Sequence, residues 1–180
     1  MQLSELLLTI LGSSDEPIAG RTAIQKITYF ASLKTRTDGG FGPHYYGPFS
    51  SGVAGLIEEL SAAGFIAEQA KRTVNDRVMY SYFLTDDGRR LFERLRNKEP
   101  QIYEIVRRVV KRCKNIANNN IGVLSWSAKI YFLITQKGAK LTYSEARQMS
   151  KKFGWQLPEN ELKTGVRLLK ALGLVRVAND

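Results

Sequence analysis

The stretch FIAEQAKRTVNDRVMYSYFLTDDGRRLFERL, residues 65–95, shows which fold this chain adopts. Two runs with the composition of β-strands, FIAEQ (65–69) and RVMYSYFLT (77–85), are joined by AKRTVND, whose Asn75-Asp76 pair is typical of a turn. The next stretch, TDDGRRLFERL (85–95), predicts a helix with Thr85 as its cap and acidic residues in its first turn. We therefore expect a β-hairpin that leads directly into a helix.

Three helices are predicted ahead of this hairpin. The first is the short apolar stretch SELLLTIL (4–11). The second, over 21–33, has one apolar face made by Ile24, Ile27, Thr28 and Ala31. The third ends at Gly64 and buries a stripe of Val53, Ile57 and Leu60. The order helix, helix, helix, hairpin, helix is that of a winged helix-turn-helix, so we expect a mainly α fold with a small β-hairpin (α+β).

The stretch GPHYYGPFSSG (42–52) is predicted to connect the second and third helices. Gly47 permits a sharp turn, and Ser50 or Ser51 offers an oxygen to the free N–H groups of the third helix. We expect Tyr45, Tyr46 and Phe49 to fill the core beneath the turn. The alternative is that the two tyrosines are exposed and stack on bases.

Two motifs carry a resemblance to known families. YFLTDDGR (82–89) resembles the segment that follows the wing in PadR-type and MarR-type regulators. The region GRTAIQKITYF…HYYGPFSSGVAGLIEELSAAGFI (20–66) is similar to the uncharacterised YwgA-like proteins, and more loosely to Panacea (SocA-like antitoxin) domains. The two matches cover about the first half of the chain. They imply a winged-helix fold and either DNA binding or neutralisation of a toxin.

The net charge of +10 is unevenly distributed. Residues 1–97 contain 11 Lys and Arg against 11 Asp and Glu, whereas residues 98–180 contain 16 against 6. This asymmetry favours a polyanionic partner, most often nucleic acid. The alternative is a basic protein whose charge serves only its solubility.

The apolar stripe of the third helix recurs 109 residues later. Val53 corresponds to Leu162, and the helix stop at Gly64 corresponds to Gly173. A buried helix (123–134) and a second helix (142–154) precede this second copy. We therefore expect a second winged-helix-like unit, with a strand after Gly173 that ends near Val177 and leaves no room for a complete wing.

The two copies differ on their outward faces. The first shows small residues and one carboxylate: Ala54, Gly55, Glu58 and Ser61. The second shows groups that suit phosphates and base edges in a major groove: Lys163, Thr164, Arg167 and Lys170. We predict nucleic-acid contacts for this second set, and also for Lys151 and Lys152 just before it.

Two further groups of cations are candidate phosphate contacts. The helix PQIYEIVRRVVKRCK (100–114) has an apolar arc and an opposite basic arc that includes Arg107, Arg108, Lys111 and Arg112. We predict that this basic arc extends the positive surface begun by Lys163 and Arg167. The hairpin tip adds Lys71, Arg72 and Arg77.

The composition argues against catalytic and metal chemistry. Cys113 is the only cysteine and His44 the only histidine, which leaves no multi-cysteine metal site and no nucleophile motif around the histidine. We expect His44 at the surface of a turn, no catalytic residue, no metal and no cofactor. The lone thiol fits the cytoplasm, and no apolar run is long enough to cross a membrane.

The sequence thus predicts a unit over 1–97, a linking basic helix over 98–120 and a second unit over 121–180. The leading hypothesis is a cytoplasmic DNA-binding protein, a transcriptional regulator that acts as a homodimer. Duplex DNA is favoured over RNA, although basic helices do not distinguish the two. The alternative hypothesis is a winged-helix protein-interaction module, either antitoxin-like or an assembly subunit, without sequence-specific DNA binding.

Overall fold

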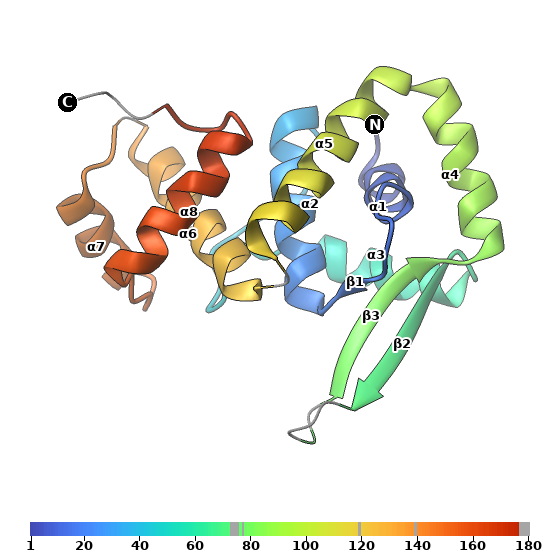
Figure 1. Cartoon of the computed structure of the whole chain (residues 1–180), viewed down its shortest axis with the longest axis horizontal. Helices are drawn as coiled ribbons and strands as arrows, with labels where there is room; N and C mark the ends of the chain where they lie inside the picture. The colour runs from blue at the N-terminus through green and yellow to red at the C-terminus, as the bar shows by residue number, and fades with distance from the viewer. Residues whose placement is uncertain (73–75, 77, 119, 139, 177–180) are drawn as a thin grey trace.

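In a computed structural model of the chain, residues 1–72, 76, 78–118, 120–138 and 140–176 are described. Within these residues the first unit consists of α1 (Leu3–Gly12), β1 (Ile18–Ala19), α2 (Arg21–Thr35), α3 (Ser51–Ala62), β2 (Ile66–Arg72), β3 (Val78–Leu84) and α4 (Asp86–Lys98). The strands form an antiparallel sheet in the order β1-β3-β2, and the hairpin extends away from the helices (Figure 1). The predicted fold class, mainly α with a small hairpin, is confirmed, and the elements follow one another in the winged helix-turn-helix order.

The hairpin is longer than the sequence predicts. β2 and β3 pair from Ile66 opposite Leu84 to Arg72 opposite Val78, although β2 has little buried surface beyond its first residues. Backbone pairing continues there because the ladder of N–H and C=O groups does not depend on apolar side chains. Lys71 and Arg72 therefore lie within a strand and not at the tip, while Arg77 lies outside the described residues.

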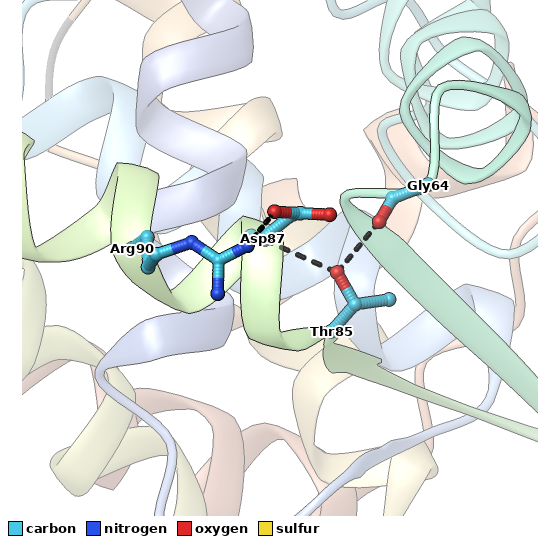
Figure 2. A network of polar contacts seen from close by, with 5 residues as sticks. Gly64, Thr85, Asp87 and Arg90 are labelled. Atoms are coloured by element: carbon cyan, nitrogen blue, oxygen red, sulfur yellow. Dashed lines mark hydrogen bonds and ion pairs between the residues drawn. The ribbon is translucent and has the colours of Figure 1, made fainter.

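A single hydroxyl joins the hairpin, α3 and α4 (Figure 2). Thr85 Oγ1 accepts a hydrogen bond from the N–H of Gly88 at 3.1 Å and donates one to the carbonyl of Gly64 at 2.6 Å. Asp87, in the first turn of α4, forms an ion pair with Arg90. The cap predicted at Thr85 is confirmed, and the same side chain ties the start of α4 to the turn that ends α3.

The loop between α2 and α3 makes the predicted turn at Gly47, which has a φ of 92°. Ser50 caps α3, because its side chain accepts a hydrogen bond from the N–H of Val53 at 3.1 Å. The prediction that Tyr45 and Tyr46 fill the core is wrong, since their side chains are 70% and 56% exposed. Side chains from α2 that bond to the loop backbone occupy the space beneath the turn instead.

The helix α5 (Pro100–Ala117) lies in the middle of the molecule. Its predicted apolar arc is buried through Val106, Val109, Val110 and Cys113. It packs against α1, α2 and α4 of the first unit and also contacts two helices of the second unit, which consists of α6 (Ile121–Lys137), α7 (Tyr143–Lys151) and α8 (Glu159–Ala171). Figure 1 shows α5 in front of α2, and α8 in front of α6.

The second unit departs from the prediction after α8. Residues 174–176 do not form the expected strand, and Val177 lies outside the described residues. A β-strand needs a neighbour to pair with, and the described part of the second unit contains none. This unit therefore has the helices of a helix-turn-helix but, among the described residues, no strand of a wing.

Candidate nucleic-acid interface

The second unit presents a helix-turn-helix made by α7 and α8. Thr142 begins α7 with a reciprocal cap, since its Oγ1 accepts from the N–H of Glu145 at 3.3 Å and its own N–H donates to the Glu145 carboxylate at 2.8 Å. The turn that follows contains Gly154, with a φ of 66°, and the buried Trp155, whose ring contacts Phe132 of α6. The contact between Trp155 and Phe132 ties the turn to α6, against which α8 also packs.

The helix ending predicted by the 109-residue repeat is present. Gly64 after α3 and Gly173 after α8 have φ values of 77° and 65°. In each case the residue after the glycine donates to the carbonyl five residues before it, at 2.9 Å after α3 and 3.0 Å after α8. The helix and its stop are thus repeated, whereas the strand that should follow is not.

The outward face of α8 carries the cations that the sequence predicts there. Lys163, Arg167 and Lys170 are exposed. Thr164 is half-buried and donates to a backbone carbonyl of its own helix at 3.2 Å, so its hydroxyl is partly occupied. Lys163 Nζ lies 3.5 Å from a carboxylate one turn earlier. Lys151 and Lys152, at the end of α7, are exposed as well.

The basic arc of α5 is exposed and lies on a neighbouring helix. Arg107 lies 3.6 Å from the carboxylate of Glu104, and Arg108 Nε donates to a backbone carbonyl at 3.1 Å. Among the described residues, no carboxylate lies within ion-pair distance of Arg108, Lys111 or Arg112. Because α5 contacts α8, the structure brings two of the predicted basic groups to adjacent elements (Figure 1).

The hairpin cations Lys71 and Arg72 lie on a third element, the strand β2. Arg72 Nη1 is 3.2 Å from the carboxylate of Asp76, which partly neutralises it, and Lys71 is exposed on β2. Figure 1 shows the hairpin extending from the lower edge of the first unit. The hairpin is not remote from α5, since Met79, which pairs with Lys71, lines a cavity together with Val110 of α5.

The outward face of α3 borders a pocket that the sequence did not predict. Ala54, Glu58 and Ser61, which were expected on this face, line a cavity of about 480 Å³ together with residues of α2, the 42–50 loop and the sheet. Glu58 is exposed and the other two are half-buried. The outward face of α3 thus borders a hollow with a carboxylate at its edge and has no basic residue.

Two polar residues of α2 are buried beside this pocket. Gln25 holds the backbone of Ser50 with both ends of its amide, donating at 2.9 Å and accepting at 3.1 Å. Lys26 is 1% exposed, and its Nζ donates to the carbonyl of Pro48 at 2.7 Å. Burial, with a smaller repulsion from Lys129, lowers the pKa of Lys26 to about 8. In the sequence, Gln25 and Lys26 belong to the region that resembles YwgA-like proteins, but nothing there predicts that they are buried.

The 42–50 loop also contacts the second unit. Trp155 Nε1 donates to the carbonyl of His44 at 2.8 Å. Lys129 of α6, which is 7% exposed, places its Nζ 4.3 Å from the centre of the Trp126 ring and 5.4 Å from that of Trp155. Residues of α2 bond to the other end of the loop. The loop therefore contacts both units, whose buried side chains belong to one hydrophobic core cluster.

No family model and no curated protein matches this chain in the comparisons with known proteins. The resemblance to YwgA-like and Panacea domains therefore stays a prediction. In the described part of the chain, no three His, Cys, Asp or Glu side chains gather as metal ligands. None of the described helices is long and apolar enough to cross a membrane.

Proposed function

We propose that this protein binds nucleic acid, with duplex DNA as the preferred form and α8 as the recognition helix. The observation that carries the proposal is the set of exposed cations on two adjacent helices, α5 and α8, most of which have no carboxylate partner among the described residues. Cations in this arrangement can neutralise several phosphates at once. Regulation of transcription by a homodimer is the finer form of the same proposal.

The test is a titration of duplex DNA, single-stranded DNA and RNA at two salt concentrations. A triple variant, Lys163→Ala, Arg167→Ala and Lys170→Ala, should weaken binding to the duplex by about tenfold or more. Its plot of log affinity against log salt should be shallower by roughly 0.9 for each phosphate that the variant no longer neutralises.

A matched control removes the same charge from the first unit. Arg89, Arg94 and Lys98 are exposed on α4, and replacing all three with Ala should change the affinity much less. A folded α8 variant with unchanged affinity would contradict the proposal. Equal losses in the two triple variants would mean that only net charge matters.

The face of α3 supports a second candidate function, a protein-interaction module. This helix has no basic residue, Glu58 and Glu59 are exposed on it, and the exposed rings of Tyr45 and Tyr46 stand nearby on the preceding loop. Exposed tyrosines are typical of protein interfaces. Wild-type protein that binds none of the three nucleic acids at low salt would favour this candidate over the first.

A further inference from the structure

The cavity of about 480 Å³ beside α3 has the size of a small-molecule site. Exposed residues form its edge, among them His44, Tyr46 and Glu58. Buried residues form its inner wall, among them Gln25, Lys26 and Tyr82. The cavity therefore runs from an open edge to a set of polar groups that are shielded from water.

The inner wall contains a cation that lacks a counter-ion. An ammonium group has three N–H donors, and the one acceptor within hydrogen-bond distance of Lys26 Nζ in the described structure is the carbonyl of Pro48. No carboxylate of the described residues lies within ion-pair distance of this ammonium. The nearest charged group that affects it is Lys129, which has the same sign. Buried charges are usually paired, so this lysine is suited to an external anion.

The start of α2 adds positive potential to the same wall. Arg21 and Thr22, in its first turn, line the cavity. The helix has no side-chain cap and no acidic residue in that turn, so the partial positive charge of its end adds to that of Lys26. The carboxylate of Glu68, which also lines the cavity, offsets the charge of Arg21. The Arg21 guanidinium is itself occupied, because it donates to the hydroxyl of Tyr82 at 2.9 Å and lies 3.5 Å from the carboxylate of Glu68.

The other walls favour an apolar ligand body. The half-buried Phe49 and the buried Ile57 line the cavity, and the exposed ring of Tyr46 adds apolar surface at its edge. We propose that this cavity binds a carboxylate attached to a small apolar or aromatic body, with the Lys26 ammonium as the partner of the carboxylate. A phosphate suits the site less well, because a single free lysine and apolar walls would leave most of its oxygens and its second charge without partners.

Such a carboxylate has two possible sources, a free organic acid or the C-terminus of a peptide that ends in an apolar residue. Phenylacetate and the dipeptide acetyl-Gly-Phe are suitable probes for them, and phenylacetamide and the amidated dipeptide are their uncharged controls. Calorimetric titration of the full chain should show binding of at least one acid and binding at least about tenfold weaker for its amide. The acid that binds more tightly shows whether the natural carboxylate comes from a free organic acid or from a peptide C-terminus.

Variants of cavity residues test whether the acid binds in this cavity. Lys26→Met should weaken binding of the acid by about tenfold or more, whereas Lys34→Met, on the same helix but outside the cavity, should leave it unchanged. Ser61→Trp should abolish binding by filling the cavity from α3 while Lys26 stays in place. If Lys26→Met does not fold, the Ser61→Trp variant still tests whether the acid binds in this cavity.

Four results would overturn the proposal. They are equal affinity for acid and amide, wild-type affinity in a folded Lys26→Met variant, wild-type affinity in Ser61→Trp, and no binding of either acid at millimolar concentration. Each of them is independent of nucleic-acid binding, so the two proposals can fail separately.

Discussion

Lys26 keeps an ammonium almost entirely shielded from solvent, since the residue is 1% exposed. Its pKa is lowered to about 8 when the chain is folded, against 10.5 when it is not. Between these two pH values the unfolded chain binds more protons than the folded chain, so the free energy of unfolding should rise with pH. The contribution is on the order of 3 kcal/mol over the whole interval and is lost as the pH falls through 8.

The measurement is the difference in the free energy of unfolding between wild type and Lys26→Met, taken from urea titrations at several pH values. A difference is needed because burial also raises the pKa of Cys113 and Tyr82 to about 12, and these two groups lower stability at high pH. We expect the stability of wild type relative to the variant to increase from pH 8 to 10.5. A difference that is flat across this interval would show that the ammonium is not desolvated.

Gly88 is a second residue whose identity is set by its surroundings, because there is no space for a Cβ atom. A Cβ at this position would clash with the backbone carbonyl oxygen of Phe65, which already accepts the N–H of Thr85 at 3.1 Å. We expect Gly88→Ala to lower the free energy of unfolding by about 2–4 kcal/mol, because backbone atoms cannot move aside as a side chain can.

The matched control for this prediction is Gly55→Ala on α3, where no atom lies within 4 Å of the added Cβ. That change should stabilise the protein by about 0.5–1 kcal/mol through helix propensity alone. Thermal and urea unfolding of both variants provide the test. A loss of stability at Gly55, or none at Gly88, would contradict the account.

Some residues were predictable because their roles depend on near neighbours in the chain. The caps at Thr85 and Ser50 follow from local hydrogen bonds, and the structure confirms both. Tyr45 and Tyr46 were placed in the core wrongly, because whether an aromatic ring in a loop is buried depends on distant elements. The buried position of Lys26 could not be predicted for the same reason, since a lysine is usually exposed.

Among the elements, α5 shows what periodicity can and cannot predict. Its apolar and basic arcs follow from the helical repeat, and burial of Val106 and Val110 confirms the apolar one. The same pattern does not predict which helices α5 packs against. The strand expected after Gly173 illustrates a second limit, because an apolar run forms a strand only where another strand is available to pair with it.

The basic arc of α5 predicts that charge reversal on this helix weakens DNA binding. Arg108 and Arg112 are exposed and have no carboxylate partner among the residues that the structure describes. Arg108→Glu together with Arg112→Glu should reduce duplex DNA affinity strongly, since each reversal replaces attraction to phosphate by repulsion. The oligomeric state, measured by sedimentation, should not change.

The control for α5 is Arg107→Glu alone, at the position whose charge is partly offset by Glu104. Its effect on affinity should be smaller than that of the double reversal. If the double variant loses its oligomeric state or a protein partner and keeps its nucleic-acid affinity, this face of α5 is a protein interface and the prediction is wrong.

At the scale of the whole molecule, the two units are held together by more than the chain connection at residues 118–120. The 42–50 loop bonds to α2 through Lys26 and Gln25 and to the second unit through Trp155. The helices α2 and α5 also pack directly against α6. The sequence indicated two units and a turn, but not that the turn contacts both units. The bond between Trp155 and His44 joins residues far apart in the chain, and no local pattern reports it.

The position of α5 has a consequence for the order in which the chain is made. A ribosome releases α1 and α2 long before it adds the valines at 106, 109 and 110, so the flank of α2 that these valines cover meets solvent first. A fragment of residues 1–97 is therefore expected to aggregate more and to be digested faster by protease than a fragment of residues 1–120, in which α5 covers α2 although α6 is missing. Equal behaviour of the two would show that the winged unit completes its core without α5. If the two fragments differ as expected, the growing chain needs protection by chaperones until α5 emerges. A chain that stops between residues 97 and 106 would then expose the same apolar flank and be a target for degradation.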